Sequence, residues 1–249
     1  MASLTTAPPR RRGTMANPKT MANPKTMTNP KTVTNPKTMA AEAYARLEEM
    51  IILGKLVPAT RLSEQMLAQA LGLGRTPIRE ALQKLRENHL VDILPRSGVF
   101  VTKVDFRSQL LVMEVRHDLE RLVARRAARR ANTAERQKFL QLAAAMRLAG
   151  ETRDKLALMA VDRQFKELSL QAAANKYLTA ALAPIHAHSR RFYFTHLETT
   201  NVPIALSHAE AIEAIGRGDE AAAVAATEAF LEAMEAFTKA VITAELAEV

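Results

Sequence analysis

The chain has 249 residues, 48% of them hydrophobic, and a formal net charge of +9 at pH 7. This length gives room for a small domain and a larger one, and no apolar run approaches the ~18 to 20 residues that a membrane-spanning helix needs. The absence of cysteine excludes disulfides, thiol catalysis and cysteine-ligated zinc, and we expect a soluble cytoplasmic protein without a membrane partner.

Residues 1–38 form a basic tail built on a hexapeptide that is repeated four times from Met15 to Thr38. The tail holds seven basic residues and no acid, which leaves only +2 for the rest of the chain. Its Asn-Pro pairs and scarce apolar groups predict a disordered, extended segment. It is either a linker or misassigned start, since Met39 directly precedes the first predicted helix, or a source of nonspecific phosphate contacts.

Residues 62–94 predict a helix-turn-helix. Ser63 can cap a short helix, and Gly72 supplies the tight turn that follows it. The second helix should begin at Arg75, give or take one residue, with Gly74 or Thr76 as its N-cap.

The second helix carries two arginines on one face. Arg75 and Arg79 lie about one turn apart, and the opposite face is an apolar stripe of Ile78, Ala81, Leu82 and Leu85. Because the second helix of this motif enters the DNA major groove N-terminus first, we interpret both arginines as base-reading residues. Taken alone, such a pair would be a solvated helix face.

A hairpin follows the second helix. Two β-branched runs flank Pro95, Arg96, Ser97 and Gly98, which predicts two strands with a basic tip, as in the wing of a winged helix. Taken together, the cap, the turn, the helix and the wing indicate that the arginine face binds DNA and is not an ordinary solvated helix face.

At this point residues 40–104 resemble the GntR family of bacterial transcription regulators. The family's core sequence Ser-Arg-Thr-Pro-x-Arg-Glu-Ala-Leu is matched from Arg75 to Leu82, with Gly74 in place of serine. An upstream signature is matched at Gly54, Pro58, Leu62 and Glu64, with Ala59 in place of a glycine, and His89 stands where the family has a glycine after the second helix.

This resemblance implies a set of DNA contacts. Arg75, Thr76 and Arg79 would contact DNA from the second helix, next to Gly74, and Arg96 and Gly98 from the wing. Gln65 is a further candidate in the first helix. At His89, a non-glycine residue at a helix C-cap implies a small strain.

Residues 106–249 predict an all-α bundle. Alanine-rich helical periodicity is interrupted near residues 132–133, 150–154, 175, 201–203 and 216–218, which indicates about six helices. Thr133 is expected to cap one of them, and Asp219 to lie in the first turn of the last. The fold class is therefore mainly α, with a winged helix-turn-helix at residues 39–105 before the bundle.

The bundle resembles the FCD effector domain of the FadR and VanR subgroup. The resemblance rests on RHDLERLVARRA from Arg116 and on HAEAIEAIGRGD from His208, and the length favours the six-helix VanR type. Many such domains hold a divalent metal with one aspartate and three histidines. Here Asp162 and His208 match, but Lys166 and Phe230 stand where two histidines would be, so we predict no tightly bound metal.

Lys166 offers a substitute for the missing cation. It lies four residues after Asp162, which suggests that its ammonium stands where a metal would, and that a small organic acid is bound by Lys166 with Arg116, His208 and Arg190. The alternative is an ordinary ion pair beside an empty or apolar pocket. His186, His188 and His196 are interpreted as surface or interface residues.

The sequence thus predicts a homodimeric regulator, and a repressor by the habit of the family, that binds an inverted-repeat operator in double-stranded DNA and responds to a small anionic effector. One alternative is an architectural DNA-binding protein without a ligand switch. An enzyme, such as a metal-dependent hydrolase around Asp162 and His208, lacks both a fuller metal shell and a nucleophile with its base, so we expect no catalysis.

Overall fold

The computed structural model describes residues 36–197 and 202–247. Apart from residues 36–38, the repeated tail therefore lies outside the described residues. Helix α1 (Pro36–Ile52) begins three residues before the expected domain start, with a proline in the first turn, where its missing N–H costs no hydrogen bond.

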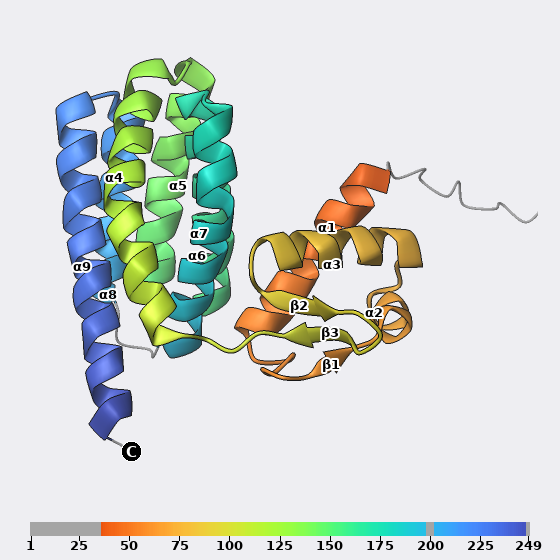
Figure 1. Cartoon of the computed structure of the whole chain (residues 1–249). Coiled ribbons are helices and arrows are strands. Elements are labelled where there is room, and N and C mark those ends of the chain that lie inside the picture. The colour runs from red at the N-terminus through yellow and green to blue at the C-terminus, as the bar shows by residue number, and fades with distance from the viewer. Residues whose placement is uncertain (1–35, 198–201, 248–249) are drawn as a thin grey trace, which may run out of the picture. The chain divides into compact units, whose positions relative to one another are not determined.

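The helix-turn-helix is confirmed at α2 (Glu64–Leu71) and α3 (Arg75–Glu87) (Figure 1). The Ser63 side chain accepts a hydrogen bond from the Met66 N–H, and Gly72 adopts the left-handed conformation that turns the chain. The predicted apolar stripe of α3 is buried, because it packs against α1. That packing leaves the arginine face of α3 exposed.

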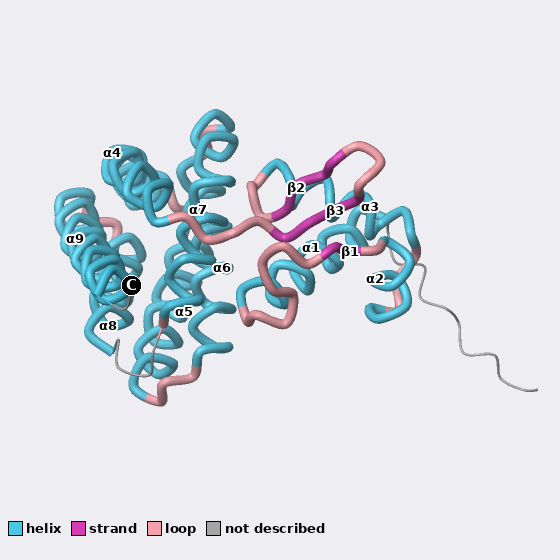
Figure 2. Tube along the Cα trace, turned by 60° about the horizontal axis from the view of Figure 1, so that its bottom comes forward, coloured by secondary structure: helices cyan, strands magenta, loops and turns pink. Residues whose placement is uncertain are grey.

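The wing is confirmed as an antiparallel pair, β2 (Val91–Leu94) and β3 (Gly98–Val101). A short strand β1 (Arg61–Leu62) pairs with the other side of β3, so the sheet has the order β1-β3-β2 (Figure 2). A two-residue strand carries too little alternation to be read from sequence.

Two residues at glycine positions of the family adopt positive φ angles. Ala59 has φ 64° and His89 has φ 57°, and His89 directly follows Asn88, which ends α3. The expected strain at His89 is therefore present, because a side chain disfavours this conformation.

The described residues of 106–197 and 202–247 form the six helices of the bundle, which lie side by side in Figures 1 and 2. They are α4 (Phe106–Arg130), α5 (Thr133–Glu151), α6 (Lys155–Ala173), α7 (Lys176–His196), α8 (Val202–Arg217) and α9 (Glu220–Ala247). No described helix is long and apolar enough to cross a membrane.

Two helix caps differ from the sequence expectation by one residue. Asn132, and not Thr133, caps α5 through a capping box with Glu135. Asp219 precedes α9 and accepts a hydrogen bond from the Ala222 N–H, so it caps the helix instead of lying in its first turn.

Small residues bring α5 and α8 close together. A Cβ atom at Gly150 would lie 2.7 Å from the Cβ of Ala205, and one at Gly216 would lie 3.0 Å from the Cβ of Phe139. The two helices therefore approach at a distance that only glycine allows at these positions.

Candidate functional site

The first candidate site is the exposed face at the start of α3. Arg75, Thr76 and Arg79 are all exposed there, as is Gly74, and Gln65 is exposed on the neighbouring α2. Arg96, with φ 63°, is exposed at the tip of the wing, and Gly98 beside it is half-buried. The fold thus presents the predicted residues to solvent, and their contacts with DNA stay predictions.

Arg79 has an intramolecular partner that the sequence reasoning missed. Its Nη2 lies 2.8 Å and its Nε 3.1 Å from the two carboxylate oxygens of Glu64. The Arg79 hydrogen bonds hold the pKa of Glu64 below its usual value. The pair spans α2 and α3, which is why helical spacing within one element gave no sign of it.

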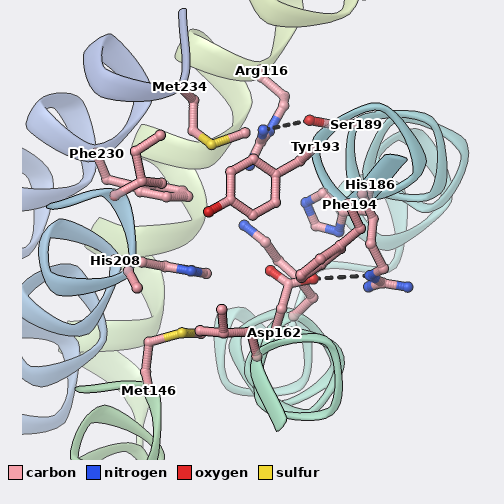
Figure 3. Close-up of a pocket in the computed structure, with 15 residues that line it drawn as sticks. Arg116, Met146, Asp162, His186, Ser189, Tyr193, Phe194, His208, Phe230 and Met234 are labelled. Atoms are coloured by element: carbon pink, nitrogen blue, oxygen red, sulfur yellow. Dashed lines mark hydrogen bonds and ion pairs between the residues drawn. The ribbon is translucent and has the colours of Figure 1, made fainter. Parts of the chain in front are cut away.

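The second candidate site is a cavity inside the bundle, with a volume of about 40 Å³ (Figure 3). All six bundle helices contribute to its wall. The five residues predicted to bind an effector all line it: Arg116, Asp162, Lys166, Arg190 and His208. The rest of the wall is mostly apolar, with Met146, Leu158, Phe194, Ile204, Phe230 and Met234.

Lys166 is paired with a residue that the sequence reasoning did not name. Its Nζ lies 2.6 Å from Oε1 of Glu120, a buried residue of α4, and forms no ion pair with Asp162. The same Glu120 oxygen lies 3.3 Å from Nη2 of Arg116 and 3.0 Å from Nε2 of His186. Burial opposes ionisation of Glu120, but Lys166 and His186 hold its pKa well below the usual value.

His186 is a further correction. It was expected at a surface or interface, but it is buried against Glu120 and lines the cavity. Burial lowers its pKa to about 4, so the ring is neutral at physiological pH. His188 and His196 are half-buried.

Asp162 is paired with Arg190 instead of Lys166. The Arg190 Nε donates to Oδ2 of Asp162 at 2.9 Å, and its Nη1 donates to Oε1 of Glu48 in α1 at 3.0 Å. Although burial opposes ionisation, the charges of Arg190 and Lys166 lower the pKa of Asp162 to about 2. Arg163 binds the second oxygen of Glu48 at 3.0 Å.

His208 points from α8 into the cavity with one nitrogen unpartnered (Figure 3). Its ring stacks on Phe230, with centroids 4.1 Å apart and planes at 10°. Burial, with the charge of Lys166, lowers its pKa to about 3. The buried Nε2 has no hydrogen-bond partner among the described residues.

The residues of this cavity do not fit a divalent metal. Nowhere in residues 36–197 and 202–247 do three or more His, Cys, Asp or Glu side chains come together as a metal site. The Nζ of Lys166 lies 6.0 Å from the Phe230 ring centroid. This ammonium and this phenyl ring line the same cavity as the two predicted ligands, Asp162 and His208. Neither can donate a lone pair to a metal at neutral pH.

Two family models match the chain. Residues 39–101 match the bacterial regulatory proteins of the gntR family, and residues 111–233 match the FCD domain.

Among curated proteins, the chain is 30% identical over 132 residues to the HTH-type transcriptional repressor RspR of Escherichia coli, covering 53% of this chain and 58% of that protein. It is 41% identical over 64 residues to an HTH-type transcriptional regulator from an unstable DNA locus of Streptomyces ambofaciens, covering 26% of this chain and 27% of that one. The matches therefore span between about a quarter and three fifths of these relatives' lengths.

Among solved structures, the fold is similar to that of E. coli McbR/YncC, with a TM-score of 0.68 at 17% identity. That similarity covers 82% of this chain and 98% of the other.

Proposed function

Because the chain belongs to the GntR family of bacterial regulatory proteins and carries an FCD domain after its DNA-binding domain, we propose that it is a ligand-responsive transcription regulator. It acts as a homodimer on an inverted-repeat operator, whose two half-sites match the two-fold symmetry of the protein. It acts as a repressor, and a small anionic metabolite bound in the bundle lowers its operator affinity and so relieves the repression.

The observation that carries the DNA-binding proposal is the geometry of α3. Its apolar stripe is held in the core, its N-terminal part exposes Arg75, Thr76 and Arg79, and the wing tip exposes Arg96. Arginine forks reach the O6 and N7 atoms of guanine from this position in a helix-turn-helix.

A chain of hydrogen bonds supports the coupling of effector to DNA. Asp162 of the cavity shares Arg190 with Glu48 of α1. The Tyr44 hydroxyl donates to Glu48 at 3.0 Å, and the amide of Asn88, the C-cap of α3, donates to that hydroxyl at 2.8 Å. A ligand that changes the Asp162–Arg190 pair thereby acts on residues that hold the end of α3.

The test maps the binding of the purified chain across fragmented host DNA at near-physiological salt. A few sharp sites that share an inverted repeat support the proposal, whereas broad, sequence-indifferent coverage supports an architectural DNA-binding protein instead. The effector is then sought among the metabolites of the neighbouring genes, as compounds that release the mapped sites.

The Arg79→Ala variant tests the base contact. It should lose about 1 to 3 kcal/mol of affinity for the mapped operator and relax specificity at one base pair. Arg86→Ala, on the exposed side of the same helix near its C-terminus, is the matched control and should preserve the sequence preference.

A further inference from the structure

The charges around the bundle cavity do not cancel. The cations Arg116 and Lys166 share one carboxylate, that of Glu120. Arg190 and Arg163 are matched by Asp162 and Glu48. Burial lowers the pKa of Lys166, but the Glu120 carboxylate 2.6 Å from its Nζ favours the charged ammonium. With Lys166 charged, one positive charge remains in surplus, and it lies at the end of the cavity formed by Arg116 and Lys166.

The two imidazoles of the cavity do not alter this balance. Burial lowers the pKa of His186 to about 4 and that of His208 to about 3, so both rings are neutral at pH 7. A surplus buried cation is costly without a counter-charge, which an anion entering the cavity would provide.

A polar group without a partner lies beside this surplus charge. Nε2 of His208 is buried, unbonded among the described residues and directed into the cavity (Figure 3). In the Nε2–H tautomer it donates one hydrogen bond, and leaving that donor unsatisfied costs free energy. The carboxylate of a ligand would satisfy it together with the surplus charge.

The remainder of the cavity restricts the ligand to a short apolar body. The volume of about 40 Å³ exceeds the ~10 to 15 Å³ that a single water needs, but it is too small for a large metabolite. Met146, Ile204 and Met234 make part of the cavity wall apolar. A second carboxylate would lie against that wall, or near Asp162 and Glu120, with no further cation to receive it.

We propose that the cavity is a metal-free site for short-chain monocarboxylates, in which Lys166 and Arg116 balance the carboxylate charge and His208 donates a hydrogen bond to it. This inference rests on the proposed function, because it names the class of effector. It differs from a metal-chelating site, where a divalent cation would favour ligands with two or more oxygen donors.

Isothermal titration calorimetry on the full chain, dialysed against EDTA, tests this with three four-carbon probes. Butyrate should bind, with an affinity at least about tenfold above that of butyramide, which lacks the charge, and of succinate, which adds a second one. Butyrate affinity should be the same without EDTA and after addition of Mn²⁺ or Zn²⁺.

Variants locate the probe in the cavity. Lys166→Met keeps a similar length but removes the charge, and should weaken butyrate binding about tenfold or more, whereas Lys138→Met, at an exposed position of α5, should leave it unchanged. His208→Gln retains a donor and should bind butyrate more tightly than His208→Phe.

Three results would overturn the inference without any variant: equal binding of butyrate and butyramide, tighter binding of succinate, or binding that requires an added metal. A failure to bind butyrate would overturn it as well. None of these results bears on operator binding by the ligand-free protein. The proposed DNA-binding function and the proposed monocarboxylate site can therefore be refuted independently.

Discussion

The two neutral histidines of the cavity should make the stability of the bundle pH-dependent. His186 and His208 have pKa values of about 4 and about 3 in the folded protein, against an ordinary value of 6.5. Because the unfolded chain binds these protons first, stability is complete above pH 6.5 and falls as the pH drops toward the folded values.

The size of this loss follows from the two pKa values. One pH unit below 6.5, each histidine lowers the free energy of unfolding by about 1.4 kcal/mol. Lowering the pH from 7.5 to 5.5 should therefore reduce the free energy of unfolding by about 3 kcal/mol through the two histidines together. The half-buried His188, whose pKa is lowered by burial and by Arg191, adds to the loss in the same direction. The acids of the cavity titrate below this window, since the pKa of Asp162 is about 2.

Amide hydrogen exchange of the slowest sites in α6 and α8 measures the free energy of unfolding of the bundle at each pH. In the His208→Gln variant, which has no ionisable ring at this position, the pH-dependent loss should shrink by about 1.4 kcal/mol. An unchanged pH dependence in this variant, or no loss at all in the parent chain, would refute the assignment of His208 as a buried neutral group.

Three further predictions concern ion pairs and backbone strain. Glu64→Gln frees Arg79 from its carboxylate partner, so affinity for unrelated DNA should rise and the ratio of specific to nonspecific binding should fall in fluorescence anisotropy titrations. His89→Gly should raise the urea midpoint by relieving a positive φ angle, with a gain of about 0.5 to 1 kcal/mol; a lower midpoint would contradict this. Arg190→Met leaves the Asp162 carboxylate without its ion-pair partner and the buried Glu48 with Arg163 alone, and should cost about 3 to 5 kcal/mol in urea unfolding, whereas Arg217→Met, in a largely exposed pair, should cost under about 1 kcal/mol, and equal costs would refute the difference.

The fold of the winged helix-turn-helix was predictable because its signals are local. The cap at Ser63, the turn at Gly72 and the buried stripe of α3 each depend on residues within one or two turns of each other. The expected strain at His89 likewise follows from one backbone position.

The cavity was predictable in its members but not in its pairings. The resemblance to a known domain selected Asp162, Lys166 and His208, and the structure brings them together. The spacing of four residues suggested that Lys166 takes the place of a cation beside Asp162, with an ordinary ion pair as the alternative, yet the two side chains bind Glu120 and Arg190 from other helices. Such pairings depend on how α4, α6 and α7 pack, which no periodicity within one helix encodes.

The burial of His186 was missed for the same reason. A histidine on an alanine-rich helix carries no sign of which face turns inward, and its partner Glu120 lies 66 positions away in the sequence.

The close approach of α5 and α8 has a mechanical consequence for the cavity. Glycines at 150 and 216 let the two helices interlock nearly backbone to backbone, so neither can shift without the other. Met146 on α5 and His208 on α8 therefore belong to a part of the cavity wall that resists displacement. We therefore expect that an effector bound as proposed would move α7 more than α5 and α8, and Arg190 on α7 connects to Glu48 of α1.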